Sequence, residues 1–159
     1  MSDMFIKLEG IDGESKDDEH TGEIDVLGWN WGMSQSGSMH QGGGGGRGKV
    51  NVQDLTFLHY LDKATGNLML CCAKGSHIPE AKLVVRKAGE DPLEYLIITM
   101  TDCIVTSIST AASQGDEMLS EQVSINFAKV KVEYQEQLPD GSGTPGPEFA
   151  WDMEKNVKA

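Results

Sequence analysis

The chain has few apolar, aromatic and basic residues. Of its 159 residues, 38% are hydrophobic and 6% are aromatic, and 13 lysines and arginines face 25 aspartates and glutamates. The formal charge of −12 repels nucleic-acid phosphates and anionic lipid headgroups, so it argues against both kinds of partner. A charge of this size instead keeps a secreted or crowded protein in solution.

Long apolar runs and a signal sequence are also missing. No apolar run approaches the ~20 residues of a transmembrane helix, so we expect no membrane insertion. Residues 1–7 show no cationic region followed by an apolar one, so we expect no signal peptide. If the protein leaves the cell, a machine that needs no such signal must carry it.

Cysteine is scarce, and its placement excludes a disulfide framework. The three cysteines are Cys71, Cys72 and Cys103, an odd count with two neighbours in sequence. This arrangement predicts folding in a reducing compartment, with the thiols acting as small buried apolar groups.

Glycine is abundant, with 19 residues, and apolar residues alternate in long stretches between glycine-rich turns. We therefore expect a mainly β protein with one domain over residues 1–159: an antiparallel β-barrel with bent strands, one flanking helix and a long protruding glycine-rich loop. Changes of alternation at Val26-Leu27 and near Ala128 predict two of the bends. Strands are expected over residues 4–8, 23–33, 50–58, 78–87, 93–109 and 119–135, with loops over 9–22 and 34–48.

The expected helix covers residues 61–75. Thr65 is its predicted N-cap, and Gly75 is predicted to follow its last turn. Further burial predictions follow from spacing alone. One helix face takes Ala64, Leu68, Cys71 and Cys72; one face of the strand over 93–109 takes Leu96, Ile98, Met100, Ile104 and Ile108; Phe149 and Trp151 dock the C-terminal tail.

No motif for catalysis, metal binding or nucleotide binding holds up. Residues 43–49 fit the start of the phosphate-binding P-loop, but the next position requires Ser or Thr and is Val50. The four histidines, His20, His40, His59 and His77, lack metal-ligand spacing, so we expect no metal and no cofactor. The acidic run over residues 17–19 is interpreted as a solvated loop. A Ser/His/Asp triad assembled in space stays open, because triads do not depend on sequence order.

Trp29 and Trp31 flank Asn30, and we expect both indoles to face the core. Strand alternation then turns Gly28, Asn30 and Gly32 to the other face, which carries almost no bulk. A small, polar sheet face can line a passage or lie against a neighbour.

Taken in order along the whole chain, many segments together resemble the Hcp (haemolysin-coregulated protein) family of the type VI secretion system. These segments are residues 5–8, 13–17 with His20, 23–40, 48–55, 61–65, 78–83, 86–89, 94–99, 126–130 and 156–159.

The resemblance implies a β-barrel subunit without enzymatic activity. Six such subunits form a ring, and stacked rings form a tube that a contractile sheath drives out of the cell with a spike at its tip. Effector proteins ride in the lumen, and the protein is secreted after assembly in the bacterial cytoplasm. The chain ends about where the core barrel is expected to end, which favours a plain tube subunit.

On this basis we expect Gly28, Asn30 and Gly32 to face the lumen. The loop residues Met39, His40, Arg47 and Lys49 are expected to contact the next ring. Two other functions stay open: a monomeric module that binds a small ligand or peptide in the barrel, and a hydrolase that uses one of the four histidines.

Overall fold

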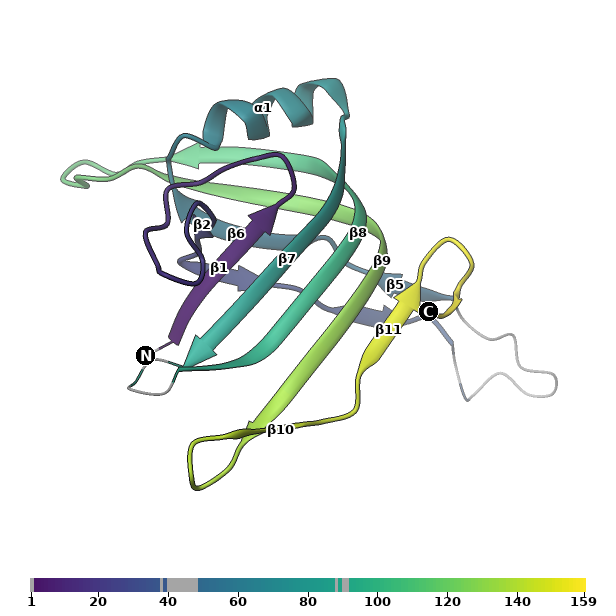
Figure 1. Ribbon diagram of the computed structural model, residues 1–159. Helices are drawn as coiled ribbons and strands as arrows, with labels where there is room; N and C mark the ends of the chain where they lie inside the picture. Colours follow the sequence, from purple (N-terminus) through teal and green to yellow (C-terminus); the bar gives the residue numbers. More distant parts are fainter. Residues whose placement is uncertain (1, 38, 40–48, 88, 90–91) are drawn as a thin grey trace.

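A computed structural model describes residues 2–37, 39, 49–87, 89 and 92–159. In this part of the chain, nearly all regular structure is β-strand, and one helix flanks the sheet (Figure 1). The strands are β1 Ser2–Leu8, β2 Ile24–Asp25, β3 Gly28–Asn30, β4 Met33–Gln35, β5 Val50–Val52, β6 Leu55–Tyr60, β7 His77–Lys87, β8 Leu93–Ala111, β9 Ser120–Gln137, β10 Gly143–Pro145, β11 Phe149–Asp152 and β12 Val157–Lys158, and the helix is α1 Thr65–Lys74.

All pairings between the strands are antiparallel, as predicted. The main sheet runs in the order β12-β11-β9-β8-β7-β1-β2. β6 pairs with the first part of β9, which β11 leaves free, and its other edge pairs with β3. The sheet curls, but the predicted barrel is not closed. β2 pairs with β1 and β3 pairs with β6, while no ladder among the described strands joins β2 to β6.

Three neighbouring strands bend at one level. In each of them, two buried residues on either side of the bend are three positions apart, where a straight strand would place them two apart. These pairs are Ile78 and Ala81 in β7, Met100 and Cys103 in β8, and Phe127 and Val130 in β9. The register places Pro79, Asp102 and Ala128 side by side at the bend. The predicted bend near Ala128 is confirmed as part of a corner that crosses the sheet.

The predicted alternation of β8 is wrong in its second half. Asp102 has a φ of 55°, and beyond it the odd positions Cys103 and Val105 are buried, while Ile104 is only half-buried. A bulge between Val105 and Ser107 then shifts the register again, so Ile108 packs against the core. A left-handed residue and a bulge each shift the alternation by one residue, so that buried positions change between even and odd numbers.

The segment after the first loop changes partner where its alternation changes. Val26 N–H donates to the Met4 carbonyl (2.9 Å), and Leu27 N–H donates to the Leu58 carbonyl (2.7 Å). The predicted switch is confirmed, but the single strand expected over residues 23–33 is divided into β2, β3 and the start of β4. The tail also docks as predicted, because β11 pairs with β9.

The helix starts differently from the prediction. Ala64 occupies the N-cap without a side-chain hydrogen bond, and Thr65 is already helical. Asp62 organises this turn instead, since its Oδ1 accepts from Ala64 N–H (2.8 Å). Gly75 ends the helix with a φ of 65°, as predicted. The predicted helix face is confirmed: Ala64 and Leu68 are fully buried, and Cys71 and Cys72 pack against the core.

The backbone at Asp102 provides a test of the corner. We expect Asp102→Val to lower the free energy of unfolding by roughly 1–2 kcal/mol, because a β-branched side chain crowds a left-handed backbone. Asp102→Gly is the matched variant and should cost nothing, since glycine accepts this φ freely. Urea denaturation measures both, and equal stability of the two variants would contradict the role of this φ.

Candidate functional site: an uncharged face, an arm and a clamped loop

The outer face of β3, β6, β9 and β8 carries no charged side chain along three rows of cross-strand partners. Each row joins residues that face the same side of the sheet. The rows are Gly28, Leu58, Gln122 and Ser109; Asn30, Thr56, Ser124 and Ser107; and Tyr60, Ser120 and Ala111. Charged residues make up 24% of the chain, so a face of this width without any is unusual for it.

This uncharged face offers hydroxyl and amide groups together with a few exposed apolar side chains. Thr56 and Ser124 hydrogen-bond each other through their hydroxyls (2.8 Å). Leu58 and Tyr60 are 38% and 41% exposed, and Leu27 lies beside them. Such a face can hold a polypeptide by hydrogen bonds and apolar contacts without an ionic contribution.

Strand alternation predicted that Gly28, Asn30 and Gly32 face away from the core, and this holds for Gly28 and Asn30. Gly28 and Asn30 lie on the uncharged face, because Trp29 between them packs against the core. Gly32 lies beyond the end of β3, close to the Gln53 side chain. Trp31 also packs against the core, and its Nε1 donates to the Gln53 carbonyl (2.9 Å). That these residues face a lumen stays a prediction.

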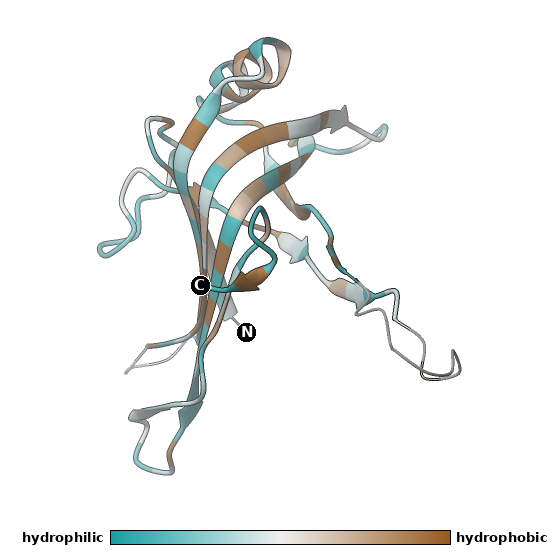
Figure 2. Ribbon diagram, turned by 90° about the vertical axis from the view of Figure 1, so that its right-hand side faces the viewer, coloured by the Kyte–Doolittle hydropathy of each residue, from teal (hydrophilic) through white to brown (hydrophobic). Residues whose placement is uncertain are grey.

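β4 and β5 form a separate two-stranded sheet, which we call the arm; it projects from the main sheet (Figures 1 and 2). Of the predicted stacking residues, Met39 is 99% exposed and Lys49 directly precedes β5. His40 and Arg47 lie outside the described residues. A strand follows Lys49 where a P-loop requires a helix, which supports the rejection of a nucleotide site.

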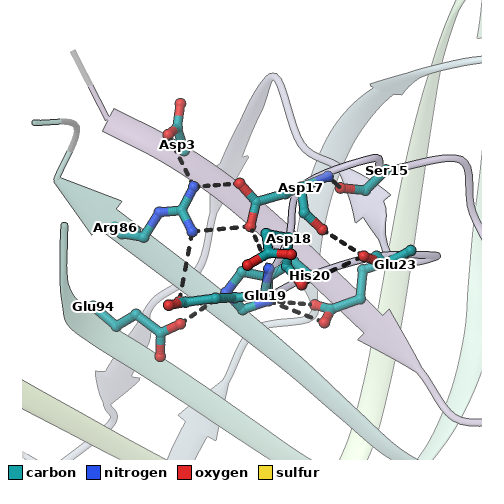
Figure 3. Close-up of polar contacts among 10 residues, drawn as sticks. Asp3, Ser15, Asp17, Asp18, Glu19, His20, Glu23, Arg86 and Glu94 are labelled. Carbon is teal, nitrogen blue, oxygen red and sulfur yellow. Dashed lines mark hydrogen bonds and ion pairs between the residues drawn. The ribbon is translucent and has the colours of Figure 1, made fainter. Parts of the chain in front are cut away.

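Arg86 clamps the acidic loop over residues 9–23 to the outside of the sheet (Figure 3). Its guanidinium donates two hydrogen bonds to the Asp17 carboxylate (2.7 and 3.0 Å) and one to the Asp3 carboxylate (3.2 Å). This forked contact lowers the pKa of Asp17 to about 2 and raises the pKa of Arg86 above its usual value. The interpretation of residues 17–19 as fully solvated is therefore wrong for Asp17, while Asp18 and Glu19 are exposed.

His20 provides the second half of the clamp (Figure 3). Its Nδ1 lies 3.0 Å from Glu23, and its Nε2 lies 2.7 Å from Glu94 at the start of β8. The imidazole also stacks on Phe5, with ring centroids 4.4 Å apart. The two carboxylates lie at opposite ring nitrogens, so the imidazole joins the loop to the start of β8.

Glu19, His20 and Glu94 each place a potential metal ligand within 4.8 Å of the others. The sequence prediction of no metal site considered only spacing along the chain, and Glu94 is 74 residues from His20. Both nitrogens of His20 already face carboxylates, and Glu19 also lies 3.8 Å from Arg86. The geometry is that of an ion-pair network.

His59 and Glu121 form a fully buried pair that sequence reasoning missed. His59 Nε2 lies 2.8 Å from Glu121 Oε1, and both side chains are inaccessible to solvent. The missed signal was parity, because Glu121 alternates with the buried Val123 and Ile125. Within the described residues, no Ser or Thr hydroxyl contacts a ring nitrogen of His59, so this pair lacks the nucleophile of a hydrolase.

One hollow beside His20 lacks the chemistry of a small-ligand site. It measures about 500 Å³ and lies beside His20, where its lining is mostly glutamate and lysine side chains. Pockets for small ligands are mostly apolar. Among the described residues, no helix has the length and apolarity to cross a bilayer.

The sequence matches the family described as "Type VI secretion system effector, Hcp" over residues 5–134. This chain belongs to the Hcp family. It is 57% identical to Protein hcp1 of Pseudomonas aeruginosa, over 99% of this chain and 98% of that protein. It is similar to the crystal structure of Hcp1 from Salmonella typhimurium (42% identity, 99% of each chain, TM-score 0.78). It is also similar to a structure described as a type six secretion system protein (28% identity, 100% of each chain, TM-score 0.93).

The resemblance inferred from the sequence is thereby confirmed, as is the mainly β class. The chain is an Hcp protein of the type VI secretion system, and the description of the family names no enzymatic activity.

The Arg86 clamp predicts a dependence of stability on pH. Folding lowers the Asp17 pKa from 3.8 to about 2, so the unfolded chain binds this proton first on acidification. The stabilisation is complete above about pH 4 and is lost as the pH falls toward 2. The gap in urea midpoint between wild type and Asp17→Asn should shrink from pH 6 to pH 3. A gap that stays constant with pH would contradict the stabilisation of ionised Asp17 by Arg86. Asp18→Asn is the control at an exposed carboxylate of the same loop.

The three thiols should react in a fixed order. Burial raises the pKa of Cys103 to about 12 and leaves none of its surface accessible, whereas Cys71 and Cys72 are half-buried on α1. At pH 8, we expect iodoacetamide to modify Cys71 and Cys72 and to reach Cys103 only in denaturant, as measured by intact mass. A Cys71→Ser/Cys72→Ser double variant should show no label before unfolding; label on Cys103 in the folded protein would refute the assignment.

Proposed function

We propose that this Hcp protein is a structural, non-enzymatic subunit of the type VI secretion tube. Six copies form a ring, rings stack into a tube, and effector proteins ride in the lumen. The contractile sheath and the spike are its other partners, and the protein is secreted after assembly in the cytoplasm. The observation that carries this proposal is the uncharged face of β3, β6, β9 and β8, which differs from the rest of a chain with a charge of −12.

A passage for protein cargo suits such a face. Fixed charges along a passage would hold cargo of opposite sign and repel cargo of the same sign. Serine, threonine, asparagine and glutamine side chains present hydrogen-bonding groups to many partners and attract none over a distance. The small residues Gly28 and Ser120 also keep the face low, which leaves room in the centre of a ring.

The remaining features fit the same assembly. The arm projects from the sheet, as a contact between rings requires; Lys49 directly precedes β5, and Met39 follows β4 in the sequence and is exposed. The sheet is not closed between β2 and β3, and each of these two strands has one edge without a partner among the described strands, which leaves these edges to a neighbouring subunit. A ring needs two different patches that complement each other, and a curled sheet with open edges offers them.

Sedimentation velocity of the wild type and of Asn30→Arg tests the proposal. We expect the wild type to sediment near six times 17.2 kDa and to keep this mass on dilution. Asn30→Arg should keep it as well, because a lumen accepts a ring of added charges that a buried subunit interface would not.

A monomer at all concentrations of wild type would refute the ring. If the wild type forms a ring and Asn30→Arg does not, the uncharged face belongs to the interface between subunits and not to the lumen. Asp140→Arg, on the turn between β9 and β10, is the control for added charge at a distance from this face.

A further inference from the structure

The arm joins the main sheet at two adjacent points of the chain, residues 31–32 and 53–54. Gln53 N–H donates to the Gly32 carbonyl (2.9 Å), and Trp31 Nε1 donates to the Gln53 carbonyl (2.9 Å). These bonds tie the two legs of the arm to each other. They do not bond the arm to β8 or β9, toward which Trp31 and Val52 supply apolar contacts with the core.

Asp54 adds a hydrogen-bonded connection to β8 and β9. Its Oδ2 accepts from the Thr106 hydroxyl of β8 (2.6 Å), and its Oδ1 accepts from Asn126 Nδ2 of β9 (2.8 Å). Both are short bonds to a carboxylate, the stronger class of protein hydrogen bond. One side chain at the base of the arm is thus held by two strands of the main sheet.

The sheet has the features needed to bring these groups together. The bulge between Val105 and Ser107 presents the Thr106 hydroxyl toward Asp54. The register of β6 on β9, with Leu55 opposite Ile125, places Asp54 beside Asn126. The bulge that returns Ile108 to the core thus also points the Thr106 side chain at a neighbouring carboxylate.

We propose that Asp54 is a positioning residue: it fixes the direction of the arm relative to the main sheet and so prepares the arm for contact with the next ring. This inference rests on the proposed function. An arm held in its bound direction loses less conformational freedom on docking than a free one. Two bonds to a carboxylate are of the size to make stacking roughly tenfold tighter or more.

The pairing chemistry of Asp54 and Asn126 supplies a sharp set of variants. Asp54→Ala removes the acceptor for both donors. Asn126→Asp sets two carboxylates against each other, where they repel. The exchange Asp54→Asn with Asn126→Asp restores one amide facing one carboxylate at the same net charge as wild type. Asp140→Ala is the control, because it removes an exposed carboxylate that accepts from Ser142 far from the arm.

Three measurements on the full chain report separately on the arm, the ring and the stacking of rings. Amide hydrogen exchange at Gln53 and along β5 reports on the arm within one chain. Sedimentation velocity reports on the ring, and electron microscopy across a concentration series reports on stacking. For Asp54→Ala and Asn126→Asp, we expect roughly tenfold faster exchange at Gln53, rings of wild-type mass, and stacks only at roughly tenfold higher concentration.

The exchanged pair should recover slow exchange and stacking, and Asp140→Ala should match wild type in all three measurements. Unchanged exchange at Gln53 in Asp54→Ala would overturn the positioning role. Faster exchange with wild-type stacking would overturn its link to the next ring. A wild type that forms no rings would defeat the proposed function and this link, while the exchange data would still decide whether Asp54 holds the arm.

Discussion

The bend that crosses β7, β8 and β9 is the constraint on which the rest of the structure depends. Strands as long as β8 and β9 would form a flat sheet with two open faces if they stayed straight. Asp102 turns the middle strand through a left-handed residue, and Pro79 and Ala128 lie beside it at the same level. Beyond the bend, β8 and β9 turn back beneath α1, which encloses the core on that side (Figure 1).

Charge is distributed to suit this curled shape. The chain is strongly acidic, and among its buried charged groups Arg86 pairs with Asp17 and His59 pairs with Glu121. The Arg86 pair lies at the outside of the sheet, where it fixes the acidic loop to β7. The outer face of β3 and β6 is left without charges, so the two surfaces of the protein present different chemistry to their surroundings.

The sequence was sufficient for the family, the mainly β class and two of the bends, and the reason is local. At Val26 and near Ala128, apolar residues stand on both sides of the bend with shifted parity, so the shift is visible along one strand. In β8, the left-handed Asp102 and the bulge at Thr106 cancel each other, which leaves Ile108 on the same parity as Met100. Between the two shifts, only Cys103 and Val105 are buried at odd positions, and two apolar residues were too few to indicate the shifts in the sequence.

The candidate sites were less accessible because they depend on pairing between distant segments. Alternation around Trp29 placed Gly28 and Asn30 correctly, since that requires one strand only. The contact of Asp17 with Arg86 spans 69 residues, and that of Asp54 with Asn126 spans 72. Register decides such contacts, and a shift of one residue would turn each side chain to the other face.

Register also explains why the arm leaves the main sheet where it does. Along its first half, β9 pairs with β6, ending at Leu55 opposite Ile125; beyond the bend, β11 takes this edge, beginning with Asp152 opposite Lys129. Between these two pairings, Met153 N–H donates to the Ala128 carbonyl (2.9 Å). The chain that precedes β6 therefore finds no free edge on β9 and pairs with β4 instead. Asp54 stands at this last position before the edge is taken, so the bend that curls the sheet also determines the base of the arm.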